Sequence, residues 1–171
     1  MSNAALHPLA PASLSPGSYA EVRARDHVVR YRRIGRGPSV LLGALNDDAL
    51  WPELSPVLAT RFRVFVPELS PCALPIDPSL LAAFLEGLGT PNVALVAGGA
   101  LCMPALELAL GNPEQITPIV LVPDGDTNGR VDGLISSPGR HDAAPLLVVH
   151  RGVAAGEAVP LIEQFLMDGF R

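Results

Sequence analysis

The sequence predicts an α/β protein built on a three-layer, doubly wound, mainly parallel sheet. Short apolar segments rich in Val and Leu recur at 39–45, 62–67, 93–97, 116–122 and 146–150. Segments with helical periodicity separate most of them. Strands of a parallel sheet are buried on both faces, so they read as continuous apolar runs rather than as alternating ones. The alternation of such strands with helices therefore predicts a sheet covered on both sides.

The length of 171 residues allows one core, and we expect a single domain over 18–171. Residues 1–17 are rich in proline and lack the basic start and unbroken apolar stretch of a signal peptide, so they predict a flexible N-terminal arm. No apolar run approaches the roughly 20 residues that a membrane helix needs. The expectation is a soluble, cytoplasmic protein without a membrane segment.

The first elements after the arm are two alternating segments, Tyr19 to Arg25 and His27 to Ile34, which predict an N-terminal β-hairpin that turns near Asp26. Helices are expected after Asn46, from residue 78 or 79 to 88, over 101–110 and over about 158–167. The segment 123–144 is rich in Asp, Gly, Ser and Pro and predicts a long loop of functional or mobile character.

Charge is distributed unevenly along the chain, which has a net charge of −5 and no lysine. Six of the twelve arginines lie in the expected hairpin or just after it, at Arg23, Arg25, Arg30, Arg32, Arg33 and Arg36. Because aromatic residues are not interleaved with them, a solvated outer face is favoured over a nucleic-acid site. We expect no nucleic-acid partner.

Metal and redox sites are not predicted. Cys72 and Cys102 both lie in apolar contexts, where buried free thiols are common. Asp124, Asp126 and Asp132 lack the ligand order and closing Glu of a calcium loop. We therefore expect no metal and no cofactor.

The segment from Leu95 to Leu110 combines an apolar strand, a sharp Gly turn and an amphipathic helix, which is the backbone plan of a nucleophile elbow. Two registers on the G-x-S-x-G pattern are open. One places Gly99 at the nucleophile, and the other places Ala100 there, with Cys102 on the closing glycine. Neither register supplies a hydroxyl or a thiol at the bend.

From Val28 to about Leu166 the order and spacing of these elements resemble the α/β-hydrolase fold. Residues 30–38 resemble the second strand of that family and the Gly-Pro lead-in to the third. Residues 51–59 resemble the helix before the fourth strand, and 145–150 the late strand before the acid loop. The resemblance implies an α/β-hydrolase-like domain, and the chain offers no segment for a cap domain.

The same resemblance implies that the catalytic triad is missing. The oxyanion turn would fall at Leu42-Gly43, without the family's His. The acid is expected just beyond His150, where only Glu157 is available and is out of register. No His follows His150 to serve as the base. With no residue assigned to catalysis, the resemblance implies a catalytically inactive protein.

Two non-catalytic roles remain open. Without the family's last strand, the strand at 146–150 should form a sheet edge, so Leu146, Val148 and His150 are interface candidates for a homodimer or a complex with a larger protein. Gly43, Gly98, Gly99 and Ala100 would instead leave a vestigial pocket for a small apolar ligand.

The alternative function is that of a small esterase or thioesterase with a relocated active site. Cys102 or His141 would serve it, and His141-Asp142 with His150 would form an acid/base pair if the long loop folds back over the elbow. A structural role is favoured for Cys102, because a reactive thiol needs exposure and a lowered pKa.

Overall fold

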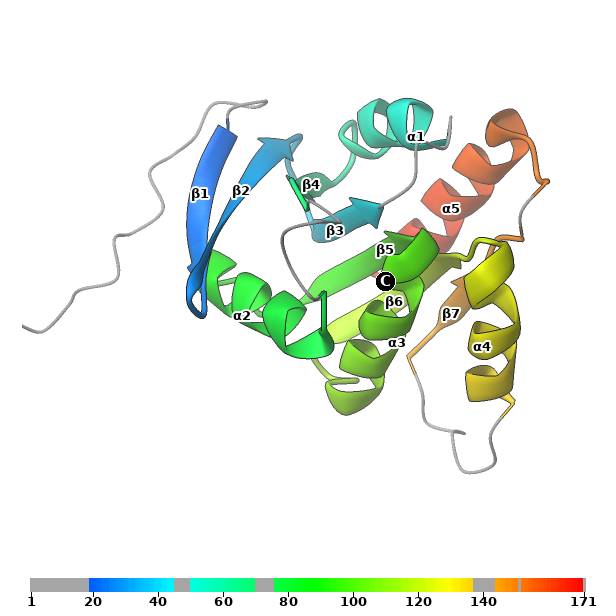
Figure 1. The fold of residues 1–171 in the computed structure, drawn as a ribbon. Helices are drawn as coiled ribbons and strands as arrows, with labels where there is room; N and C mark the ends of the chain where they lie inside the picture. Colours follow the sequence, from blue (N-terminus) through cyan, green and yellow to red (C-terminus); the bar gives the residue numbers. More distant parts are fainter. Residues whose placement is uncertain (1–18, 45–49, 70–75, 137–143, 151, 171) are drawn as a thin grey trace, which may run out of the picture.

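A seven-stranded sheet lies at the centre of the computed structural model, which describes residues 19–44, 50–69, 76–136, 144–150 and 152–170 (Figure 1). The strands are β1 Tyr19–Ala24, β2 His27–Ile34, β3 Ser39–Ala44, β4 Arg63–Pro67, β5 Val93–Gly98, β6 Ile116–Val122 and β7 Leu146–Val148. They are ordered β1-β2-β4-β3-β5-β6-β7 across the sheet. The strands from β3 to β7 pair in parallel, whereas β2 pairs antiparallel with both β1 and β4. The mainly parallel α/β sheet and the N-terminal hairpin are both confirmed.

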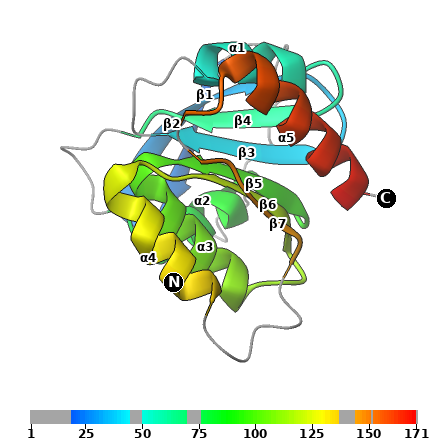
Figure 2. The same ribbon diagram turned by 90° about the vertical axis from the view of Figure 1, so that its right-hand side faces the viewer.

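Helices cover both faces of this sheet, which gives the three expected layers. The helices are α1 Leu50–Leu58, α2 Pro78–Leu88, α3 Cys102–Gly111, α4 Gly125–Ile135 and α5 Ala155–Gly169, and the 3-10 turn η1 Gly99–Leu101 precedes α3. Figure 2 shows α1 and α5 together on one face and α2, α3 and α4 on the other. None of the described helices is long and apolar enough to cross a bilayer.

Two apolar cores follow from this layering, one on each face of the sheet. On the α1 and α5 face the buried helix residues are Leu50, Leu54, Leu58, Ala158, Val159, Ile162 and Leu166. On the opposite face they are Leu80, Leu81, Phe84, Leu85, Cys102, Ala105, Leu106, Leu108, Ala109 and Val131. Because β5 is buried along its whole length, its carboxyl end is held rigidly between the two layers.

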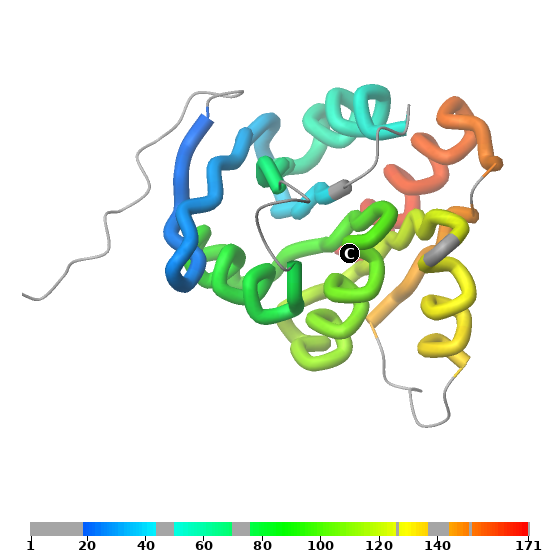
Figure 3. The backbone as a smooth tube through the Cα atoms, viewed as in Figure 1, coloured from blue at the N-terminus to red at the C-terminus, as the bar shows by residue number. Residues whose placement is uncertain are grey.

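The long loop predicted for 123–144 is wrong over Gly125–Ile135, which forms α4. Figure 3 follows the backbone from β6 through α4 and on to β7. A reciprocal capping box starts the helix: the Asp124 side chain accepts a hydrogen bond from the Thr127 backbone, and the Thr127 hydroxyl accepts one from Asp124 N. Val131 is fully buried in the core of this face and Leu134 packs against that core, so these two apolar residues anchor the helix.

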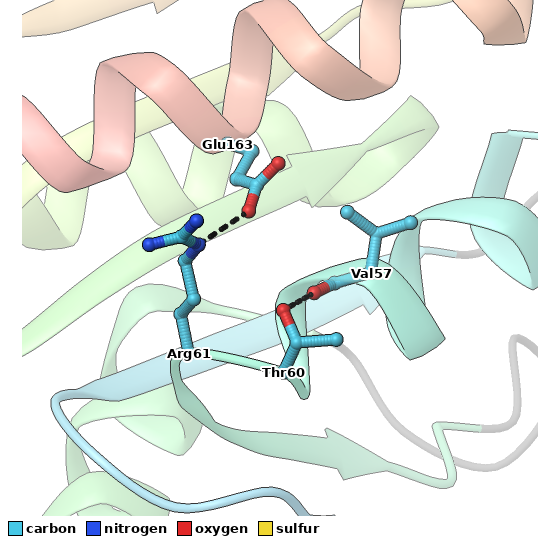
Figure 4. A network of polar contacts seen from close by, with 4 residues as sticks. All are labelled: Val57, Thr60, Arg61 and Glu163. Atoms are coloured by element: carbon cyan, nitrogen blue, oxygen red, sulfur yellow. Dashed lines mark hydrogen bonds and ion pairs between the residues drawn. The ribbon is translucent and has the colours of Figure 1, made fainter.

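The last helix, α5, contacts the turn before β4, which lies far from it in the sequence (Figure 4). Arg61 Nε lies 3.1 Å from Glu163 Oε1 on α5. The Phe62 and Phe170 rings pack with centroids 5.8 Å apart. Because this pairing links residues about 100 positions apart, it helps to fix α5 over the sheet.

At one end of the sheet lies β7, as expected for the strand at 146–150, although it covers only Leu146–Val148. Ile119 N donates to Pro145 O at 2.9 Å, and Val149 N donates to Leu121 O at 2.8 Å. Successive residues of a strand turn their amides to opposite sides. The backbone groups of Leu146 and Val148 therefore point away from β6, toward the open edge.

Candidate functional site

The site suggested by the sequence lies where β5 ends and the chain turns into α3. The bend occurs at Gly99, whose φ of 58° is in the left-handed region. In a nucleophile elbow the nucleophile occupies this strained strand-to-helix turn. The geometry therefore favours the register with Gly99 at the nucleophile position over the one with Ala100. A glycine there supplies the backbone freedom that the bend requires and no reacting atom.

Gly98 has a different role, because it allows a close approach by the indole ring of Trp51. A Cβ atom added at Gly98 would lie 2.0 Å from Trp51 Cζ2 and 2.8 Å from Cη2, so any side chain there would force the Trp51 ring to move. Trp51 comes from the first turn of α1 and packs within the apolar core of that face. The ring therefore covers the end of β5 on this side.

Gly43 lies on the other face of the sheet. A Cβ atom there would lie 3.0 Å from Leu101 Cδ1, and Leu101 belongs to the core formed by α2 and α3. Gly43 is paired with Ala97 and not with Gly98. The two glycines that were expected to face each other across a shared pocket are thus separated by the sheet, and each is explained by tight packing.

A cavity of about 20 Å³ remains beside Gly43. Its lining is apolar and consists of Leu41, Gly43, Leu81, Leu95, Val96, Ala97, Leu101 and Ala105. A single water needs about 10–15 Å³ by the same measure, and ligand pockets measure about 300–1,000 Å³. The cavity beside Gly43 thus has room for roughly one water and not for a small-molecule ligand.

Cys102, the thiol nearest to the bend, is fully buried at the start of α3. Its Sγ donates to the Ala97 carbonyl oxygen at 3.3 Å, so the side chain turns back toward β5. Burial raises the pKa of Cys102 to about 12, and the negative charge of Asp124 acts in the same direction, against an opposing hydrogen bond with the Val122 backbone. A buried, protonated thiol lacks both requirements for a nucleophile.

Among the described residues, the other titratable candidates are not brought to the bend as a group. His150 is exposed just after β7, where its Nδ1 lies 3.2 Å from Asn128 Oδ1 on α4. Glu157 is exposed in the first turn of α5. His141, Asp142 and Cys72 lie outside the described residues. Asp124 is occupied as the N-cap of α4.

No metal centre is formed within the described ranges, where no three His, Cys, Asp or Glu residues are placed to hold an ion. The residue that sequence reasoning missed at this site is Trp51, which fills the space over Gly98. A tryptophan in the helix just after a strand gives no sign of the direction in which its ring points. Only the packing of α1 across β3 and β5 determines that contact.

No family model matches the sequence, and no curated protein matches it. Three solved structures, each with a TM-score of 0.53, illustrate the structural similarity. Haloalkane dehalogenase DbeA from Bradyrhizobium elkani is 22% identical over 61% of this chain and 41% of its own. Carboxylesterase CesB from Bacillus subtilis is 17% identical over 63% of this chain and 43% of its own. Epoxide hydrolase VrEH1 from Vigna radiata is 21% identical over 65% of this chain and 41% of its own.

The matched part thus spans about two fifths of each of these enzymes. All three have the α/β-hydrolase fold. At these identities the similarity concerns the fold, and the activity of each enzyme remains its own. From its parallel sheet, its covering helices and these neighbours, the chain has the α/β-hydrolase fold.

Proposed function

We propose that this chain is a catalytically inactive protein of the α/β-hydrolase fold that acts by assembling with another protein. The observation that carries the proposal is the bend at Gly99, which keeps the left-handed geometry of an elbow and has no side chain to attack a substrate. Acyl transfer by this fold needs a nucleophile activated by a base. Cys102, the nearest alternative, is buried and has a raised pKa.

Assembly is favoured over ligand binding by the packing around the bend. Trp51 lies against Gly98 on one face, and Leu101 approaches Gly43 on the other. The apolar cavity beside Gly43, about 20 Å³, is far below the volume that binds a small molecule. This packing among the described residues supports a role for the surface and the strand edges over a role for a pocket at the bend.

The surface that we propose for assembly is the β7 edge. Leu146 and Val148 point their backbone groups away from β6, and all three side chains of β7 are half-buried and apolar. An exposed, apolar edge strand is a ready template for a strand from another chain. The proposed partner is a larger protein that adds one extended segment to this edge and so continues the sheet.

Catalytic inactivity is tested with p-nitrophenyl acetate and p-nitrophenyl butyrate. Turnover should equal the buffer rate for the wild-type protein and remain there in Cys102→Ala and His141→Ala. Turnover above the buffer rate that either substitution abolishes would contradict the proposal. It would favour the small esterase or thioesterase with a relocated site.

Assembly at β7 is tested by comparing what co-purifies with the wild-type protein and with Val148→Pro. Proline removes the N–H that points to the open edge and leaves the inward hydrogen bonds of β7 in place. Leu161→Ala is the matched control, because Leu161 is apolar, 49% exposed and on α5. A partner that binds the wild type and the control and is lost from a folded Val148→Pro supports the β7 edge. Equal retention by all three contradicts it.

A further inference from the structure

The opposite end of the sheet has a second open edge, formed by β1. Among the described residues no strand pairs with its outer side. An open hollow of about 410 Å³ lies along it, lined by Tyr19, Ala20, Glu21 and Arg30. Tyr19 is 49% exposed, with Arg30 stacked 4.3 Å from its ring centre. The described residues therefore leave this edge accessible to another chain.

The hairpin register shows which backbone groups of β1 face this edge. Arg25 and Asp26 form a two-residue turn, and Ala24 pairs with His27 at its base. In a two-residue hairpin the pair that closes the turn exchanges both hydrogen bonds, and the pattern then alternates along the ladder. Tyr19, Glu21 and Arg23 consequently turn their amide groups outward.

Two copies of β1 can pair antiparallel through these outward groups in only a few registers. Centring the pair on Glu21 places Glu21 against itself, and centring it on Arg23 places Arg23 against itself. Centring it on Val22 places Glu21 of each copy opposite Arg23 of the other, with five residues of each strand overlapping. Opposite charges directly across a ladder stabilise it, and like charges destabilise it.

From this charge complementarity we propose that β1 is a self-association edge, which pairs antiparallel with β1 of a second copy about a two-fold axis at Val22. A two-fold pairing of this kind closes on itself and gives a dimer rather than a filament. The proposed surface is independent of the β7 edge, which stays free for a different partner.

The arginines of the neighbouring strand do not oppose this pairing strongly. The hairpin region 19–37 carries six arginines against Glu21 and Asp26, in a chain whose net charge is −5. The β2 strands of the two copies would be three strand spacings apart, about 14 Å, which exceeds the screening length of about 8 Å at physiological salt. Arg30 is in addition paired with Glu68 at 3.7 Å.

Sedimentation equilibrium over micromolar to millimolar concentrations tests the proposal. Glu21→Arg and Arg23→Glu each place like charges opposite one another twice per dimer, so each should weaken dimerisation by about tenfold or more. The double variant Glu21→Arg/Arg23→Glu restores opposite charges and should dimerise like the wild type. Arg36→Glu, which makes the same charge change outside β1, is the control and should have little effect.

A register-specific cross-link provides a second readout. In the Cys72→Ser background, Val22→Cys should form a disulfide-linked dimer under mild oxidation, because the two residues face each other across the axis. Tyr19→Cys is exposed but lies far from its own copy in this register and should not cross-link. A wild-type protein that stays monomeric at millimolar concentration would overturn the proposal. So would a dimer that is indifferent to both single charge reversals, whatever the behaviour of Val148→Pro.

Discussion

The buried thiol of Cys102 allows a quantitative test of the packing at the elbow. Burial raises the pKa of this thiol from its ordinary value of 9.0 to about 12. At pH 8 the thiolate fraction then falls from about 9% to about 0.01%, so alkylation through the thiolate should be about a thousandfold slower than for a free thiol. Exclusion of the reagent from a fully buried side chain slows it further.

The assay is iodoacetamide labelling at pH 8 in a Cys72→Ser background, so that Cys102 is the only thiol. Mass spectrometry follows the modification in native buffer and in concentrated urea, where the unfolded protein gives the reference rate. The expected ratio of the two rates is about a thousand or more. A native rate within tenfold of the unfolded one would refute the burial and reopen a nucleophilic role for Cys102.

The same shift makes stability depend on pH in a defined direction. Because the folded-state pKa is raised, the contribution of the protonated thiol is complete below pH 9 and is lost as the pH rises toward 12. Between pH 7.5 and pH 10 the wild type should lose about 1.4 kcal/mol relative to Cys102→Ala. Urea unfolding of both proteins, again without Cys72, measures this difference. An equal gap at the two pH values would contradict the raised pKa.

Three further substitutions test the architecture around the bend. Gly98→Ala forces a methyl group against the Trp51 ring 2.0 Å away, so it should lower the free energy of unfolding by about 1–3 kcal/mol in urea titrations. The control is Gly111→Ala, whose added methyl group has nothing within 4 Å and should be neutral or stabilising. In Gly99→Ser the serine must adopt a left-handed φ, which should lower the free energy of unfolding by about 1–2 kcal/mol. The variant should still give no ester turnover, because a hydroxyl without a base is inert. Asp124→Ala removes the N-cap of α4 and should lower stability by about 1 kcal/mol, whereas Asp124→Asn, which also caps helices, should retain most of it.

Periodicity predicted the sheet and most of its helices because each element has a strong local signal. The elbow strand Val93–Gly98 is a continuous apolar run, and Gly99 marks the bend directly. The hairpin was predicted from alternation and is found at Tyr19–Ala24 and His27–Ile34. Local patterns of this kind survive in the fold because they match its burial.

The incorrect prediction of a loop where α4 lies also has a local cause. Three glycines and the absence of apolar residues before Val131 hide the helical pattern, and only Val131 among the helix residues is both apolar and fully buried. Composition therefore indicated a loop. The signal that could have revealed the helix is the Asp124–Thr127 capping pair, which fixes the helix start without any apolar periodicity.

The tight packing at Gly43 and Gly98 could not be predicted, because it depends on side chains that meet across layers. Whether Gly43 and Gly98 share a pocket is decided by the pleat of two neighbouring strands. The positions of Trp51 and Leu101 depend on how α1 and α3 pack on the sheet. Such contacts are properties of the whole packing, and a single sequence contains no local signature for them.

Trp51 is the only tryptophan in the chain, and its ring rests on the glycine next to the bend. The tryptophan fluorescence of the protein therefore comes from the candidate site itself, without any engineered label. A partner or a small molecule that loosens this contact would expose the indole to water and shift its emission to longer wavelength. Binding at the β1 edge, four strands away from β5, would leave the emission unchanged, so one spectrum can tell whether a newly found partner acts at that edge or near the bend.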